Sequence, residues 1–128
     1  MNIMDQRLFP FVQALEIEKK ALEDCLLRLK IDQNTQKDLI QVIEIINSRL
    51  DKGGKIVITG VGKSGKIAQK ISATLASTGS MSIFLHPTEG MHGDLGMLSS
   101  NDVVLALSHT GNTEEILKLI PSIKEIGI

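Results

Sequence analysis

The sequence predicts an α/β fold, a three-layer doubly wound arrangement in which a parallel sheet of three strands lies between helices and follows two further helices. Two observations predict it. Three short, mostly aliphatic runs alternate with longer segments whose apolar residues recur at helical spacing. Strands that alternate with helices are joined by right-handed crossovers, which makes neighbouring strands parallel.

Two helices are expected before the first strand, over residues 10–30 and 35–50. Pro10 suits a first helical position because its missing N–H costs nothing there. Thr35 is expected to cap the second helix, and the glycines at 53–54 are expected to end it. The apolar stripes are Val12, Leu15, Leu22, Leu26 and Leu29 in the first helix, and Leu39, Val42, Ile43, Ile46 and Leu50 in the second.

The first strand is expected at 55–59, a continuous β-branched run typical of strands buried on both faces. The second is expected at 81–85 and the third at 102–107. A helix ending at Gly79 follows the first strand, and another spans 114–126. The residues expected to face inward are Ile67, Ile71 and Leu75 in the former helix, and Ile116, Leu119, Ile120 and Ile123 in the latter.

The remaining segments connect these elements. Residues 86–96 are polar and Gly-rich, which predicts a loop with at most one short helical turn, and Pro121 predicts a bend in the last helix. Three strands make a small sheet with a bare parallel edge. We therefore expect residues 51–128 to be the N-terminal part of a larger domain, the alternative being that another subunit covers the edge. Residues 1–50 are expected to pack on this domain or on a partner subunit.

Composition limits the possible functions. With 128 residues the chain has room for one domain, and its net charge of −1 offers no basic surface for nucleic acid or acidic lipid. The absence of Trp and Tyr argues against stacking platforms for bases. The single cysteine, Cys25, excludes an internal disulfide and is predicted to be a small buried apolar residue. Residues 1–11 do not resemble a signal peptide, and no apolar run approaches the roughly 18 residues of a membrane span, so we expect a cytoplasmic chain.

Two polar turns indicate where a ligand binds. If the strand order is 2-1-3, the ligand crevice lies between the carboxyl ends of the first and third strands, where residues 60–65 (GVGKSG) and 108–113 (SHTGNT) meet. Each turn precedes a helix, whose unpaired N–H groups suit a phosphate. The available hydroxyl donors are Ser64, Ser108, Thr110 and Thr113. The alternatives are a plain N-cap role for Thr113 and a tight-turn role for the glycines.

Nucleotides fit this pattern less well. Residues 60–65 match the dinucleotide fingerprint G-x-G-x-x-G, but no acidic residue follows the second strand to hold a ribose. The nucleotide P-loop requires Gly where Val57 stands. A simple phosphate ester fits better than NAD or ATP.

Several titratable residues lie near the crevice: Lys63, His86, Glu89, His92, Asp94, His109, Glu114 and Glu115. The spacing of the three His matches no metal-ligand pattern, so no metal site is expected. Lys63 is suited to stabilise a phosphate or an enolate, the alternative being a solvated loop lysine. His92 lies in a Gly-flanked loop and is otherwise a mobile surface residue. Of Glu114 and Glu115 at most one is catalytic, since one helix turn cannot aim both at the same point. The alternative is that both only complement the helix dipole.

Three segments carry a family resemblance: GVGKSGKIAQKISATLASTG, HPTEGMHGDLGML and LSHTGNTEEI. They resemble the SIS (sugar isomerase) domain, and most of all the arabinose 5-phosphate isomerases, over about residues 50–128. The resemblance implies a SIS-type sheet of flavodoxin-like order and interconversion of arabinose 5-phosphate and ribulose 5-phosphate through an enediolate, with no cofactor. It also points to Kdo supply for lipopolysaccharide or capsule.

The resemblance also implies residue roles. Lys63, His92 and Glu115 correspond to the catalytic set, with the base left open between His92 and Glu115. The implied substrate and phosphate set is Gly62, Ser64, Ser108, His109, Thr110, Gly111 and Thr113. The implied partner is a small sugar phosphate, in a homo-oligomer that is typically a tetramer.

Some features depart from the family pattern. Family members supply another active-site His from beyond position 128, many carry a pair of CBS repeats, and many have Glu where Asn112 stands. The second hypothesis is a non-catalytic sugar-phosphate sensor, and the third is an assembly scaffold built on the two leading helices. Retention of Lys63, His92 and Glu115 favours chemistry over sensing.

Overall fold

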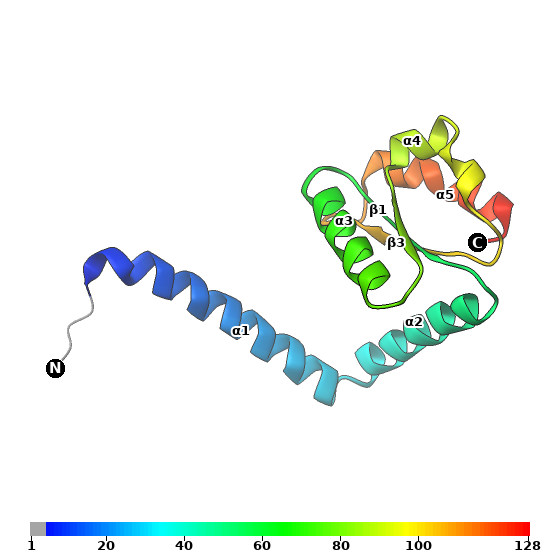
Figure 1. Cartoon of the computed structure of the whole chain (residues 1–128). Helices are drawn as coiled ribbons and strands as arrows, with labels where there is room; N and C mark the ends of the chain where they lie inside the picture. The colour runs from blue at the N-terminus through cyan, green and yellow to red at the C-terminus, as the bar shows by residue number, and fades with distance from the viewer. Residues whose placement is uncertain (1–4) are drawn as a thin grey trace. The chain divides into compact units, whose positions relative to one another are not determined.

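A computed structural model describes residues 5–128 of the chain (Figure 1). It consists of two compact units, of which the second begins at Ile43. The predicted N-terminal helical segment spans residues 1–50, and residues 1–4 of it lie outside the described residues.

The first unit is entirely helical. A short 3-10 helix, η1 (Gln6–Leu8), leads into α1 (Phe9–Ile31), with Pro10 in its first turn as predicted. No residue of α1 is buried, and its leucines are largely exposed, Leu22 by 72%. The prediction that Cys25 is buried is therefore wrong: its thiol is exposed, because the helical stripe around it has no covering layer within this unit.

The break between the first two helices lies at Asp32. Its carboxylate accepts hydrogen bonds from the Asn34 amide at 3.0 Å and from the Thr35 hydroxyl at 2.7 Å, so α2 (Gln33–Asp51) already contains Thr35. The prediction of Thr35 as the cap is wrong, because Asp32, three residues earlier, takes that role. The hydrogen bond from Thr35, followed by that from the Asn34 amide, lowers the pKa of Asp32.

The second unit holds a parallel sheet in the predicted order. The strands are β1 (Ile56–Gly60), β2 (Ser82–Leu85) and β3 (Val103–Leu107), arranged β2-β1-β3, and every residue of β1 is buried. One face packs on α3 (Gly62–Ser77); α4 (Pro87–Met91) and α5 (Glu114–Ile126) lie on the other, as Figure 1 shows. The three-layer prediction is confirmed.

Side chains of β1 alternate between two hydrophobic clusters. Ile56 and Ile58 pack with Ala68 of α3, whereas Val57 packs with Leu85 and with Leu119 of α5. This alternation is the period-two pattern of a strand buried on both faces.

Two inward-facing predictions are wrong. Ile67 of α3 is 56% exposed, and Ile120 of α5 is 36% exposed. On α3 the buried positions are small instead, Gly65, Ala68 and Ser72, so the helix lies too close to the sheet for a large side chain at its centre.

The segment 86–96 is more helical than predicted. It contains α4 and most of a second short element, the 3-10 helix η2 (Asp94–Met97). His86 explains why α4 forms, because its side chain caps this helix by accepting a hydrogen bond from the Thr88 amide. Imidazole capping followed by Pro87 was not recognised in the sequence as a helix start.

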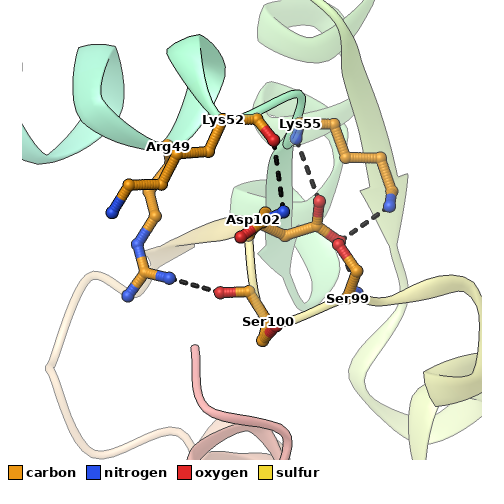
Figure 2. Close-up of polar contacts among 7 residues, drawn as sticks. Arg49, Lys52, Lys55, Ser99, Ser100 and Asp102 are labelled. Carbon is orange, nitrogen blue, oxygen red and sulfur yellow. Dashed lines mark hydrogen bonds and ion pairs between the residues drawn. The ribbon is translucent and has the colours of Figure 1, made fainter.

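A buried carboxylate ties together the amino ends of β1 and β3. Asp102, only 1% exposed, accepts hydrogen bonds from the Lys55 amide at 2.9 Å, the Lys55 ammonium at 2.7 Å and the Ser99 amide at 2.8 Å (Figure 2). Burial by itself raises the pKa of Asp102, but these hydrogen bonds and the charge of Lys55 outweigh it and hold the pKa below its usual value. The carboxylate therefore stays ionised near neutral pH.

The end of α2 is attached to the same corner. Arg49 donates to the Ser100 carbonyl, as Figure 2 shows, and the Asn101 amide side chain donates to the Lys52 carbonyl at 3.1 Å. Gly54 passes so close to Asn101 that an added Cβ would lie 1.9 Å from its carbonyl oxygen, so only glycine fits there. These contacts set the level at which β1 and β3 start.

We expect Asp102→Asn to lower the free energy of unfolding by about 2–4 kcal/mol, because it leaves the Lys55 ammonium without its partner. Denaturant unfolding at pH 7 measures this. Glu114→Gln is the matched control, since it breaks an exposed pair with Lys118 and should leave stability unchanged within error. Equal stability of Asp102→Asn and wild type would contradict the role given to Asp102.

Stability in acid should depend on the same carboxylate. Because the folded-state pKa of Asp102 lies below the value of about 3.9 expected for an unfolded chain, the group stabilises the fold above that pH. This stabilisation is lost as the pH falls through the folded-state pKa. Unfolding free energies measured from about pH 5 to pH 2 should fall more steeply for wild type than for Asp102→Asn. Parallel curves would assign the acid sensitivity to the exposed carboxyls whose pKa is also lowered, those of Asp5, Asp32 and Glu114.

Candidate functional site

The two predicted turns meet at the carboxyl edge of the sheet. β1 and β3 are paired through Gly60 and Leu107, so the chain leaves both strands at the same level. Residue 61 then leads into α3, and residues 108–113 lead into α5. The turns are thus neighbours, as the 2-1-3 order predicts.

α3 begins without a side-chain cap. Its N-cap residue, Val61, has no polar side-chain atom, and the Gly65 amide is the first to reach a helical carbonyl, that of Val61. The amides of residues 62–64 are therefore donors at the positive end of the helix dipole. Lys63 and Ser64 lie in this first turn.

Glycine is required in this turn for space and for conformation. A Cβ on Gly65 would lie 2.7 Å from the Gly60 carbonyl oxygen, so the helix start and the strand end touch through backbone. Gly62 has a φ of 60°, in the left-handed region that glycine tolerates best. The glycines thus bring the first turn of α3 directly over the end of β1.

The turn after β3 is held by its own hydroxyls. The Ser108 and Thr113 hydroxyl oxygens are 2.8 Å apart, and the Gly111 amide donates to Ser108 Oγ at 3.0 Å. The Asn112 amide donates to Thr110 Oγ1 at 3.2 Å, and Gly111 adopts a φ of 74°. Hydrogen bonds within the turn itself thus help to hold its shape.

Thr113 occupies the N-cap position of α5 but does not cap it. Its hydroxyl makes no bond to the amides of the first turn and pairs with Ser108 instead. The alternative of a plain N-cap role is therefore not what the structure shows. Two hydroxyls that share one hydrogen bond keep one O–H proton between them, so the pair can still donate to an anion.

The three residues of the predicted catalytic set come from three helices. Lys63 is in the first turn of α3, His92 is the C-cap residue of α4, and Glu115 is in the first turn of α5. Lys63 and His92 are exposed and Glu115 is half-buried. Among residues 5–128 no hydrogen bond or ion pair links these side chains to one another.

The structure separates the roles of the two neighbouring glutamates. Glu114 forms an ion pair with Lys118 at 2.6 Å, and the hydrogen bond from Lys118 lowers the pKa of Glu114. Glu115 has no such partner in the described chain. Of the two carboxylates, Glu115 is the one that no ion pair engages within residues 5–128.

The two other histidines, His86 and His109, lie outside the predicted catalytic set. The His86 ring caps α4 and lies edge-on to Phe84 at 6.4 Å, which is a structural role. His109 is exposed within the 108–113 turn. Within residues 5–128 no group of three or more His, Cys, Asp or Glu side chains is close enough to hold a metal ion.

No described helix is both long and apolar enough to cross a membrane.

A cavity of about 250 Å³ opens at this edge, on the side of β2 rather than between β1 and β3. Its lining comprises Gly60, Gly62, Gly65, Lys66, Gln69, Phe84 and His86. Sequence reasoning did not single out Lys66 and Gln69. Their spacing of three and six residues from Lys63 along one flank of α3 is the signal that could have found them.

Comparisons with known proteins agree with this arrangement. A family profile for the SIS domain matches residues 49–128. The chain is 43% identical over 116 residues to arabinose 5-phosphate isomerase KdsD of Pseudomonas aeruginosa, covering 91% of this chain and 33% of that protein. It is 47% identical over 97 residues to arabinose 5-phosphate isomerase KpsF of Escherichia coli O6:H1, covering 74% of this chain and 30% of that protein.

A solved structure is also similar. The c3406 protein of E. coli CFT073, in complex with arabinose 5-phosphate, superposes with a TM-score of 0.68 at 39% identity, covering 97% of this chain and 62% of that one. The chain therefore spans about a third of the length of the curated relatives it matches. With the matched domain, the sheet order and the two turns in place, the chain belongs to the SIS domain family.

Proposed function

We propose that this chain carries the sugar-phosphate site of an aldose–ketose isomerase that interconverts arabinose 5-phosphate and ribulose 5-phosphate. The observation that supports it most is that α3 and α5 both begin without a side-chain cap at the same edge of the sheet. Identities of 43% and 47% to arabinose 5-phosphate isomerases support the choice of sugar. The relative solved with arabinose 5-phosphate supports a sugar-phosphate ligand.

The phosphate would bind between the two turns. Amides of the first turns of α3 and α5 point toward the carboxyl edge, and the Ser108–Thr113 pair has one O–H proton to donate. Ser64 and Thr110 add hydroxyls, and the left-handed glycines keep the approach open. Hydrogen bonds from neutral donors to a phosphate dianion are individually stronger than those between neutral groups.

The isomerisation requires proton transfer between neighbouring carbons. A base removes the proton from C2 of the aldose, an enediolate forms, and a proton is delivered to C1 while O2 loses a proton and O1 gains one. Glu115, which forms no ion pair within residues 5–128, is suited to be that base, and His92 is suited to move the proton between the oxygens. Lys63 would stabilise the negative charge of the enediolate. This route uses no cofactor.

The surroundings of the site are part of the proposal. β3 has a strand partner on one side only, and a groove of about 320 Å³ runs along its other edge between Val104, Ala106 and Ile120. We propose that residues 51–128 are the N-terminal part of a SIS domain whose further strands cover this edge, in a cytoplasmic homotetramer that supplies Kdo synthesis. The relatives' greater length supports the first part, that the domain extends beyond these residues.

Glu115→Gln should lower the rate of isomerisation at least about 100-fold, since a positioned general base contributes that much or more. Proton NMR of arabinose 5-phosphate in heavy water measures ribulose 5-phosphate formation and deuterium incorporation together. Glu114→Gln, one residue away and engaged with Lys118, should retain turnover. Binding without turnover in wild type would mean that a further segment of the domain completes catalysis, and equal loss in both variants would contradict the role of Glu115.

Ser108→Ala should weaken binding of arabinose 5-phosphate about 10- to 100-fold, because it removes both an O–H donor and the acceptor that holds the Gly111 amide. Isothermal titration calorimetry gives the dissociation constants. Ser77→Ala removes a hydroxyl at the far end of α3 and should bind as wild type. If the Ser108→Ala protein is folded and binds arabinose 5-phosphate as tightly as wild type, the phosphate does not bind at this turn.

A further inference from the structure

The last side chain before the Gly-rich turn is a buried hydroxyl with no partner. Thr59 is 0% exposed, and its Oγ1 forms no hydrogen bond with any of residues 5–128. It is the one buried side-chain polar atom of the described residues left in that state. By contrast, Ser72, also buried, pairs with the Ser82 hydroxyl at 3.2 Å.

Packing does not explain this hydroxyl. Burying a hydroxyl without a partner is unfavourable, whereas Val has the same shape without that penalty and is well suited to a central strand. The neighbouring positions of β1 are indeed aliphatic, Ile56, Val57 and Ile58. Thr at position 59 therefore needs a reason other than the stability of the free protein.

Strand geometry places Thr59 beneath the turn that follows β3. Alternation puts Thr59 on the same face as Val57, the face covered by α4 and α5. Thr59 is paired in register with Ala106, whose side chain alternation directs to that face, and Ser108 follows two residues later, just beyond the end of β3. Thr59 thus lies near the carboxyl end of β1, level with the residue two positions before Ser108 on the neighbouring strand.

In the free protein the Ser108 hydroxyl is already satisfied. It accepts from the Gly111 amide and shares a hydrogen bond with Thr113. A phosphate oxygen would compete for both the Gly111 N–H and the spare hydroxyl proton, since hydrogen bonds to an anion are the stronger ones. Ser108 Oγ would then have acceptor capacity to spare.

We propose that Thr59 is a positioning residue of the sugar-phosphate site: its hydroxyl donates to Ser108 Oγ when an anionic ligand draws the donors of the 108–113 turn toward itself. The buried hydroxyl lowers the stability of the ligand-free protein, and its hydrogen bond to Ser108 raises the affinity of the protein for the anionic ligand. The inference rests on the proposed function, because it concerns the same site.

The experiment compares Thr59→Val, Thr59→Ser and wild type in thermal unfolding and in calorimetric titration with arabinose 5-phosphate. Thr59→Val should raise the unfolding midpoint of the free protein by about 4 °C and weaken binding about fivefold. Thr59→Ser, which keeps the hydroxyl, should restore affinity. Ser72→Ala, a buried hydroxyl on the α3 face, should change the midpoint but not the affinity.

A double-mutant cycle shows whether Thr59 acts through Ser108. In a Ser108→Ala background, Thr59→Val should cause no further loss of affinity, whereas independent effects would add. Wild-type affinity of Thr59→Val, or additive losses in the cycle, would overturn this inference alone and leave the phosphate site standing. Failure of wild type to bind arabinose 5-phosphate would overturn the proposed function and this inference with it.

Discussion

The fold depends on one buried carboxylate at the amino edge of the sheet. Asp102 joins the start of β3 to the start of β1 through both the amide and the ammonium group of Lys55, at 2.9 and 2.7 Å. Parallel strands have no tight turn to align them, so this contact between residues 47 positions apart helps to hold their starts level. Because the two strands start level, they also end level, with Gly60 opposite Leu107.

The level ends determine what the opposite edge can do. Both α3 and α5 begin there within a few residues of a strand. Gly60 and Gly65 bring the start of α3 close to the end of β1, and α5 follows a turn held by the hydrogen bond between Ser108 and Thr113. Neither helix uses a side chain to cap its first amides. Their positive ends thus carry no side-chain cap, which is the feature on which the proposed phosphate site rests.

The sequence predicts the sheet well and the surfaces less well. A β-branched run such as 55–59 is typical of a buried strand, and the flavodoxin-like strand order was implied by the resemblance to the SIS domain. Cys25 and Ile67 were placed inside because helical spacing does not say which stripe is covered, or whether small residues bring a helix too close for large ones. Of the site, the residue types and turns were predictable. The unpaired hydroxyl of Thr59 and the Ser108–Thr113 pair were not, since hydrogen-bond partners depend on tertiary neighbours.

The central claim is that both turns form a single anion site. Amide-resolved NMR titration with arabinose 5-phosphate tests it most directly, with phosphate-free arabinose as the control. The account predicts that amides of Lys63 and Ser64, and those of Glu114 and Glu115, shift together and saturate with one dissociation constant. Shifts confined to one turn, two different saturation curves, or equal shifts with arabinose would contradict it.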